Sequence, residues 1–497
     1  MSEPRIRPIR WRFRVELLSD DEVERIHDAV LTVLERVGLE IASEPVLREL
    51  AAAGARVDLQ AGRVRLPREL VEEAVSLAPR SYVMAARDPA CDMTIDGSAG
   101  YLSLDGTTAH LIDLETGVRR PPTTEDFVHA MVLSDAIPEI SFTWPPFAIS
   151  DVPPRLQSVQ QAYLELAMCT KHAQPNESIT PEDARATIEL ARVVAGGADE
   201  LRRRPLISSY QMSISPLTYD GTTIEAALEF ARAGVPAGFV SMAVATAAAP
   251  TTLAGQLVSI GAEVLGGVAL LETLVPGAPT FIGAYEAFMD LSTGDLDAAW
   301  GGEDVLIRLA AAQMARRWGL ALNVGGFGTG ANAPDWQAGA QSMLATMGVA
   351  QAGSGELISG VGTVHTSMAF SFEEMVLDAE LFGMVCHMLD RGFPVTEEDL
   401  AVSVIEAVGP GGHFLAHPHT RAHMRERWRS ELFLRDTWEE WTAKGRPDPR
   451  DLAREKVRGI LATHEPEPLP EDVDRELRAI VEHRRHELGS PGTKEGR

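Results

Sequence analysis

The sequence predicts an α/β protein, and more narrowly a (β/α)8 barrel of the TIM type with an N-terminal helical and antiparallel-β extension and a C-terminal helical extension. Between residues 138 and 408, short apolar segments alternate with longer segments of helical periodicity. This alternation is typical of βα units, which build a parallel sheet. Seven strand-like segments are visible, and this number favours a closed barrel over an open sheet.

The expected strands and helices alternate along this region. We place the strands at 140–144, 167–172, 205–212, 236–244, 279–285, 320–326 and 356–362. Helical stretches are expected at 182–196, 222–233, 251–274, 303–318, 335–351 and 372–391. The eighth strand is not obvious, and we expect it either near the N-terminal junction or around 401–408.

The segments on either side of the expected barrel have a different character. Ser19 and Glu22 predict a capping box in front of a helix that ends before Gly38. Strand-like runs at 81–86, 91–96, 100–104 and 109–113 then predict a small antiparallel sheet. We therefore expect an N-terminal extension at 1–120, a catalytic barrel at 121–408, a C-terminal helical extension at 409–485 and a disordered tail at 486–497.

Composition and charge restrict the class of partner. The 497 residues include 72 acidic and 45 basic ones, which gives a formal net charge of -27. An acidic surface disfavours nucleic acid and anionic membranes, because both attract positive charge. Three scattered cysteines disfavour a disulfide framework and a thiolate zinc site. The N-terminus lacks the apolar core of a secretory signal and the chain lacks a long uninterrupted apolar run, so we expect a cytoplasmic protein.

Residues that follow the expected strands are the most informative, because barrel enzymes keep their active sites there. The run 325–330 holds four glycines, which allow the backbone to approach a ligand closely. It lacks the Lys-Ser/Thr of a P-loop, so a tight turn or a backbone-lined floor for a small ligand is favoured over a phosphate cradle. Lys171 could form a Schiff base or pair with a carboxylate, and we prefer the second use.

The histidines offer two further possibilities. Four of them lie between 413 and 423 at spacings that could bind a metal, but Pro418 interrupts the helix and no cysteine or carboxylate completes the set. Packing of the turn is therefore preferred there, and no tightly bound metal is expected. His365 stands alone after the last expected strand, where a structural histidine is the ordinary alternative to a functional one. Its place at the expected barrel mouth makes it our candidate catalytic residue.

Several segments together resemble one family. They include LSDDEVERIHDAVLTVLERVGLEI at 18–41, LIDLETGVRRPPTTEDF at 111–127, PGAPTFIG at 276–283, the NAPD turn at 332–335 and VGPGGHFL at 408–415. In order and over nearly its whole length, the chain is similar to the trimethylamine methyltransferase family. The resemblance implies a (β/α)8 barrel that demethylates an amine and passes the methyl group to a separate corrinoid protein. It also implies that the pyrrolysine of the founding members would stand near 325–330.

This sequence contains only standard residues, and the glycine run has no reactive side chain. The chain therefore resembles the branch without pyrrolysine, which is known for glycine betaine and related quaternary amines. A quaternary ammonium leaves as a neutral amine, so the enzyme needs only positioning and surroundings suited to the disappearing charge. The expected partners are a cognate corrinoid protein that carries the cobalamin, a small quaternary amine, and further copies of the chain in a homo-oligomer.

Aromatic faces attract a quaternary ammonium, and a betaine carboxylate needs a cation or hydrogen-bond donors such as His172. The expected catalytic residue is His365. The expected substrate-binding residues are Trp144, Lys171, Tyr210, Gln211, Phe239, Tyr285, Asn323, Phe327, Gly328 and Trp336. Two alternatives stay open: a barrel lyase or metal-dependent hydrolase that uses Lys171 or a histidine-bound metal, and a non-catalytic protein that binds quaternary amines.

Overall fold

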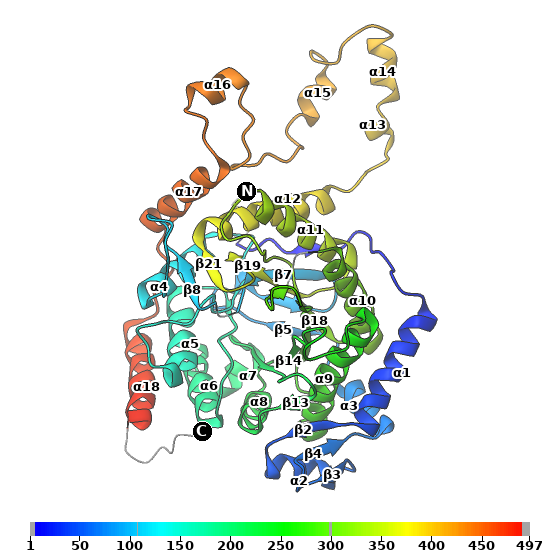
Figure 1. Cartoon of the computed structure of the whole chain (residues 1–497). Coiled ribbons are helices and arrows are strands. Elements are labelled where there is room, and N and C mark those ends of the chain that lie inside the picture. Colours follow the sequence, from blue (N-terminus) through cyan, green and yellow to red (C-terminus); the bar gives the residue numbers. More distant parts are fainter. Residues whose placement is uncertain (1–4, 107, 298–300, 490–497) are drawn as a thin grey trace.

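A computed structural model describes residues 5–106, 108–297 and 301–489 (Figure 1). At its centre lies a 7-stranded sheet whose strands are parallel except for the first, which is antiparallel to its neighbour. The strands follow the order β1 (Ile9–Arg10), β7 (Ala99–Leu104), β19 (Leu357–Val361), β18 (Ala321–Gly325), β15 (Thr280–Ala284), β14 (Ala237–Ser241) and β12 (Ser209–Met212). The predicted α/β class is confirmed.

Two short strands lie between the ends of this sheet. Strand β10 (Phe142–Thr143) pairs in parallel with β11 (His172–Ala173). An isolated parallel bridge joins Leu102 of β7 to Ile140, just before β10, and another joins Ala173 of β11 to Ile207, just before β12. Parallel pairing therefore continues from each edge of the large sheet into this pair of strands.

Each predicted helix of the alternating region is present, with ends within about two residues of the expected ones. They are α6 (Pro181–Ala195), α8 (Gly221–Ala233), α9 (Leu253–Leu274), α10 (Gly302–Trp318), α11 (Trp336–Ala352) and α12 (Phe372–Arg391). The chain adds α4 (Thr124–Ala136), α5 (Gln157–Met168) and α7 (Ala198–Arg203). Caps explain the boundaries: Asp220 accepts two backbone N–H groups at the start of α8, and Gly234 ends it with φ 80.

Three predictions about strands need correction. Residues 100–104 are not part of an antiparallel N-terminal sheet, because β7 pairs in parallel with β19 and is antiparallel only to the short β1. Residues 401–408 do not form a strand, since α14 (Val402–Val408) occupies them. The expected strand at 167–172 begins inside α5, and only His172 enters β11. Short runs of apolar residues do not by themselves distinguish a parallel strand from an antiparallel strand or from a short buried helix.

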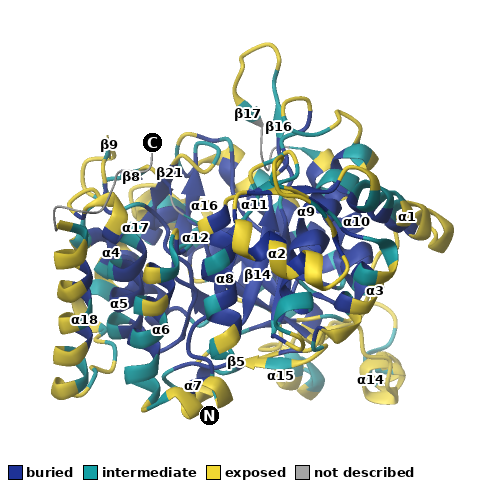
Figure 2. Ribbon diagram, turned by 90° about the horizontal axis from the view of Figure 1, so that it is seen from below, coloured by how far each residue is buried: buried dark blue, intermediate teal, exposed yellow. Residues whose placement is uncertain are grey.

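Helix α9 forms part of the core. It contacts β14 and β15 on one side and α1 and α3 on the other, and Figure 2 shows it buried together with β14 at the centre of the molecule. By length and composition it is the one described helix that could cross a membrane, but 78% of its most apolar window is buried inside the protein. The glycines Gly266 and Gly267 allow this close packing, because a Cβ at either position would meet the side chain of Leu39 or Phe239.

The N-terminal extension holds α1 (Asp20–Arg36), which starts at the predicted Ser19–Glu22 capping box. It continues with β2 (Leu39–Ile41), α2 (Glu44–Ala52), β3 (Arg56–Asp58), β4 (Arg63–Arg65), α3 (Arg68–Leu77), β5 (Tyr82–Met84) and β6 (Met93–Ile95). Short strands elsewhere are β8 (His110–Ile112), β9 (Arg119–Arg120), β13 (Thr218–Tyr219), β16 (Phe288–Met289), β17 (Leu296–Asp297), β20 (Thr363–Val364) and β21 (Ala369–Ser371).

After α12 the chain leaves the body of the molecule. Helices α13 (Glu397–Leu400), α14, α15 (Pro418–His423) and α16 (Trp438–Ala443) stand away from it in two projections (Figure 1). The chain returns with α17 (Pro449–Thr463), which packs on α12, and α18 (Glu471–Gly489), which packs on α5 and α6. The expected disorder at 486–497 is wrong for residues 486–489, which belong to α18, while 490–497 lie outside the described residues.

Candidate active site

A cavity of about 410 Å³ lies where the parallel strands end. Because the carboxyl ends of parallel strands meet at one end of a sheet, α/β enzymes keep their active sites there. Residues on or directly after β7, β10, β11, β12, β14, β15, β18 and β19 line it. They include Asp105, Gly106, Trp144, Asn176, Glu177, Tyr210, Met212, Met242, Tyr285, Glu286, Gly325, Phe327, Gly328, Ser359 and Gly360, joined by Leu296, Arg308, Thr366, Ser367 and Met368.

Aromatic rings form one wall of the cavity. The ring centroids of Trp144 and Tyr210 are 4.8 Å apart, and those of Trp144 and Tyr285 are 6.4 Å apart. Phe327 is a further aromatic residue of the lining. The sequence analysis predicted all four, and the structure brings them to one cavity. Such a group of rings suits a quaternary ammonium, whose charge is attracted by the π-face while its methyl groups contact apolar surface.

Hydrogen bonds fix the two tyrosines. The Tyr210 hydroxyl donates to Asn176 Oδ1 at 2.8 Å. The Tyr285 hydroxyl lies 2.7 Å from Asn323 Oδ1 and 2.6 Å from Ser359 Oγ. Asn323 was predicted to contact substrate, but in the structure its amide oxygen is engaged by Tyr285 and the residue does not line the cavity. Its role there is to position an aromatic ring.

Three carboxyl groups accompany the rings. Burial raises the pKa of Glu177 to about 7. Burial also raises the pKa of Glu286 to about 7, against the opposing effect of the Arg308 guanidinium. The pKa of Asp105 is raised as well, again by burial. Glu177 and Glu286 can therefore change protonation state near neutrality, and any of the three carboxyl groups favours a bound cation when it is ionised.

The glycine run contributes the floor of the cavity. Gly325, Phe327 and Gly328 line it, and Gly328 has φ 111, a conformation that a side chain would strain. A Cβ at Gly325 would lie 3.7 Å from an Arg308 nitrogen and 3.7 Å from the Tyr285 ring. A side chain at this position would therefore contact both the guanidinium and the ring.

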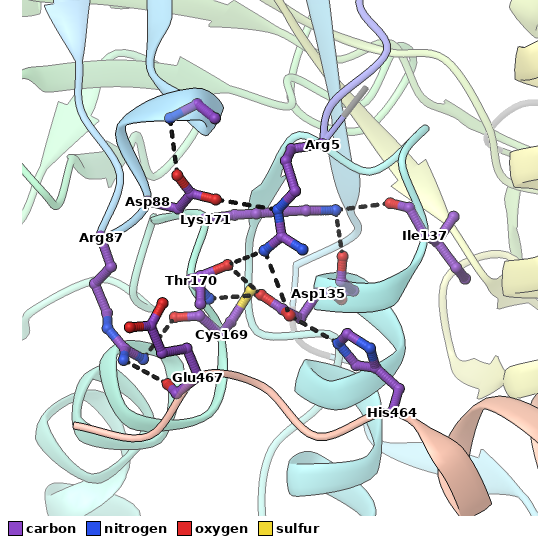
Figure 3. Close-up of polar contacts among 12 residues, drawn as sticks. Arg5, Arg87, Asp88, Asp135, Ile137, Cys169, Thr170, Lys171, His464 and Glu467 are labelled. Atoms are coloured by element: carbon purple, nitrogen blue, oxygen red, sulfur yellow. Dashed lines mark hydrogen bonds and ion pairs between the residues drawn. The ribbon is translucent and has the colours of Figure 1, made fainter. Parts of the chain in front are cut away.

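Lys171 corrects the sequence-based placement most clearly. It precedes β11, so it lies at the amino end of the strands, opposite the cavity. Figure 3 shows its side chain pointing toward Ile137. Its Nζ donates to the backbone oxygens of Ser134, Ile137 and Ile140 at 2.6, 2.7 and 2.6 Å. With all three protons engaged, the ammonium group is available neither to a substrate carboxylate nor for a Schiff base.

Four other expected residues also lie apart from the cavity. His172 is buried between Ala85 O and Ser208 Oγ, at 2.7 and 3.0 Å. The side chains of Gln211, which bonds Ser209 Oγ, and Phe239, which packs on Tyr219, are fully buried. Trp336 is 89% exposed at the start of α11, where it borders a separate cavity of about 660 Å³ between α11, α12 and the C-terminal extension.

His365 lies at the rim rather than in the lining. Its Nδ1 is paired with Asn332 Oδ1, and its backbone N–H donates to Ala331 O at 2.7 Å. His365, Thr366 and Ser367 have φ 54, 53 and 57 in succession, and this left-handed turn presents Thr366, Ser367 and Met368 to the cavity. Non-glycine residues in this conformation are costly and gather at functional sites.

The sequence analysis missed several residues of the lining. Asp105 follows β7, so it would have been found had β7 been recognised as a strand of the parallel sheet. Asn176 and Glu177 lie a few residues after β11. Arg308 comes from the buried face of α10, for which the sequence carries no signal. As for metals, no group of three or more possible ligands occurs among the described residues.

Comparison with known proteins bears on the class of the chain. Residues 3–489 match the family model described as "Trimethylamine methyltransferase (MTTB)". Trimethylamine methyltransferase MttB of Desulfitobacterium hafniense (strain DSM 10664 / DCB-2) is 35% identical over 476 residues, 95% of this chain and 94% of that protein. The glycine betaine methyltransferase of Desulfitobacterium hafniense (strain Y51) is 31% identical over 478 residues, 96% of this chain and 98% of that one.

Among solved structures, the monomethylamine methyltransferase MtmB of Methanosarcina barkeri aligns over 90% of each chain, with 13% identity and a TM-score of 0.48. The sequence relatives cover nearly the whole chain and are named methyltransferases, so the protein is an amine methyltransferase. It belongs to the trimethylamine methyltransferase (MTTB) family. The resemblance found in the sequence is confirmed.

Proposed function

We propose that this chain transfers a methyl group from a quaternary amine of the betaine type to the Co(I) of a cognate corrinoid protein, without pyrrolysine. The observation that carries the proposal is the combination of aromatic rings and carboxyl groups in one cavity at the strand ends. Rings and carboxylates both favour a cation. The 31% identity to a glycine betaine methyltransferase over 96% of the chain supports the same substrate class.

The residues of this chain would bind and orient the substrate. Trp144, Tyr210 and Tyr285 hold the ammonium, and the low exposure of the cavity walls strengthens electrostatic contacts by excluding water. The partner's cobalamin supplies the nucleophile when it is bound. The amine leaves neutral, so no residue has to donate a proton to it, and the absence of a reactive side chain at Gly325 and Gly328 fits a mechanism of this kind.

Two exposed methionines suit the approach of a partner. Met242 and Met368 line the cavity and are 38% and 46% exposed. Flexible, polarizable side chains at a cavity mouth adapt to a large apolar ligand. We propose that these two methionines contact the corrinoid when the partner protein binds over the mouth of the cavity.

We also propose that the parallel strands close into a (β/α)8 barrel. The parallel bridges Leu102–Ile140 and Ala173–Ile207 support closure, because they extend the pairing from β7 to β10 and from β11 to β12. The circular order would be β7, β10, β11, β12, β14, β15, β18 and β19. In this arrangement the extension 1–120 supplies the missing eighth strand, β7, to the barrel at 121–408, and the region 409–485 stays a separate helical extension.

A homo-oligomer in the cytoplasm completes the proposal. The projecting segment between α12 and α17 exposes Phe393, Ile405 and Leu415 by 92, 57 and 84%. Apolar side chains exposed to this extent on an extended segment are typical of contacts between subunits. The net charge of -27 suits the cytoplasm.

The test mixes the purified chain with Co(I) cobalamin and a panel of methylamines and betaines, and follows methylcobalamin by absorbance. We expect methyl transfer from quaternary amines alone. Demethylation of trimethylamine would contradict the substrate class. Binding without transfer would favour the non-catalytic alternative, and activity that is lost on chelation and restored by zinc alone would favour the hydrolase.

A further inference from the structure

One ion pair stands inside the cavity. Arg308 of α10 and Glu286, just after β15, approach to 2.5 Å, and their side chains are 2% and 3% exposed. Among the described residues that line the cavity, Arg308 is the one cation, whereas Asp105, Glu177 and Glu286 are carboxyl groups. Arg308 is therefore the one positively charged side chain that the described lining offers to a negative group of a ligand.

The pair leaves bonding capacity unused. Arg308 Nε and Glu286 Oε2 are buried and have no hydrogen-bond partner among the described residues. A buried charged group with an unsatisfied atom is costly, because the atom has lost water and gained nothing. Both atoms belong to residues of the cavity lining, so a ligand bound in the cavity can supply the missing partners.

The position of the guanidinium matches the geometry of a small zwitterion. A Cβ at Gly325 would lie 3.7 Å from Arg308 Nη2 and 3.7 Å from the Tyr285 ring. The guanidinium and the Tyr285 ring are therefore neighbours, because both lie within contact distance of one point above Gly325. An ammonium placed among the rings would carry its carboxylate to Arg308.

We propose that Arg308 is the specificity-determining residue for the substrate carboxylate, and that it exchanges part of its contact with Glu286 for the ligand. The inference rests on the proposed function, since it places the betaine ammonium in the aromatic wall. Protonation of Glu286 assists the exchange, because burial raises the pKa of this carboxyl to about 7 and a neutral Glu286 releases the guanidinium. Without a carboxylate, a quaternary amine gains nothing from Arg308.

The experiment measures dissociation constants by calorimetry, without any corrinoid. The probes are trimethylammonium carboxylates with one to three methylene groups, each paired with the trimethylammonium alcohol of equal length. In Arg308→Gln we expect the carboxylates to bind about tenfold more weakly or worse, which is the loss of one charge-assisted contact, and the alcohols to be unchanged. In Glu286→Gln at pH 8 we expect tighter binding of the carboxylates.

Two further variants serve as a control and as a replacement should Arg308→Gln fail to fold. Arg317→Gln lies on the same helix but removes an ion pair with Glu24 on the surface, so it should leave both probe series unchanged. Should Arg308→Gln fail to fold because Glu286 is left without its partner, the double variant with Glu286→Gln keeps a neutral amide pair. It should show the same selective loss for carboxylates.

The inference would be overturned if Arg308→Gln weakened both probe series equally, or if it kept full carboxylate binding. It would also be overturned if the wild type bound no carboxylate more tightly than the alcohol of equal length. The proposed function is tested separately from the role of Arg308, by the methyl-transfer assay. A wild type that prefers carboxylates through Arg308 but methylates no Co(I) cobalamin would uphold the inference and contradict the function.

Discussion

Buried charges occur at both ends of the parallel strands, and they are treated differently. At the amino end, the Lys171 ammonium donates to three backbone oxygens, among them that of Ile137 (Figure 3). At the carboxyl end, Arg308 and Glu286 are equally buried, yet each keeps a polar atom that no described residue engages. The hydrogen-bonding capacity of Lys171 is filled by the protein itself, whereas that of Arg308 and Glu286 is filled only when a ligand binds.

The neighbours of Lys171 extend the contrast. Asp135 Oδ1 accepts from the Thr170 backbone N–H at 2.7 Å and from its hydroxyl, while Oδ2 lies 2.8 Å from His464 Nε2. Burial by itself would raise the pKa of Asp135, but these hydrogen bonds hold it below its usual value. Arg5 also contacts Thr170 and Asp135, so Arg5 of the N-terminal extension and His464 of the C-terminal extension meet at Asp135 of α4. The pairing of Lys171 and Asp135 predicts a role of these two residues in stability.

The largest expected effect is therefore on folding. Replacing Lys171 by Met removes three hydrogen bonds to buried carbonyl oxygens, and we expect the free energy of unfolding to fall by about 3–5 kcal/mol. Urea denaturation measures it. Lys456→Met is the control, because that ammonium is partly exposed and pairs with the exposed Glu431, so a loss of less than about 1 kcal/mol is expected. Equal losses of unfolding free energy in the two variants would contradict the structural role of Lys171 at the amino end of the strands.

A smaller effect, on affinity, is expected at the carboxyl end. Trp144→Leu removes the ring that contacts both tyrosines, and we expect quaternary amines to bind about tenfold more weakly, or about 1.4 kcal/mol. The measurement is the ratio of affinities for a quaternary ammonium and for its neutral carbon isostere, since the change in cavity shape affects both. Trp336→Leu should leave the ratio unchanged, because that indole is 89% exposed. A changed affinity ratio in Trp336→Leu would show that Trp336 contacts the ammonium after all.

Proton binding gives a third test. Burial raises the pKa of Glu177 and of Glu286 to about 7 and raises that of Asp105. A quaternary cation without a carboxylate favours their ionised forms, so its affinity should increase severalfold as the pH rises through about 7.

The increase should be smaller for a betaine, because ionised Glu286, with Asp304 beside it, then competes for Arg308. Calorimetry of both ligands between pH 6 and pH 8 measures the difference. Glu177→Gln should reduce the slope for the cation. An affinity that falls as the pH rises would contradict the assignment of these carboxyls to the ammonium.

The same comparison explains what the sequence could predict. Helices such as α8 and α9 were located to within about two residues, because capping residues and periodicity are local signals. The aromatic wall was found because Trp144, Tyr210 and Tyr285 lie on or just after strands. These predictions needed no knowledge of how distant segments pair.

Predictions that depended on pairing were the ones that failed. Strand β7 lies among short strand-like runs that predicted an antiparallel sheet, and only its pairing with β19 identifies it as part of the parallel sheet and brings Asp105 to the cavity. Lys171 stands one residue before β11 rather than after it, and that shift moves it to the opposite end of the sheet. Arg308 reaches the cavity from a helix, through packing that no local pattern encodes.

The smallest expected effect concerns His365, which the sequence analysis named as the catalytic residue. The structure places its ring against Asn332 at the rim, while Thr366, Ser367 and Met368 face the cavity. His365→Gln keeps a side chain that can bond Asn332, so the left-handed turn should persist. We expect kcat/KM to fall by about twofold to threefold, less than about 1 kcal/mol, with the melting temperature unchanged.

The alternative outcome is equally definite. If His365 contacts substrate, the glutamine variant should lose tenfold or more in kcat/KM while the melting temperature stays constant, because the fold would be intact and a contact with the reacting molecule lost. A fall in melting temperature together with activity would show instead that the turn depends on the imidazole, since three successive residues there hold φ 54, 53 and 57 and need support. Measuring KM separately decides between these cases, because a displaced Met368 or Ser367 would weaken substrate binding before it slowed the transfer itself.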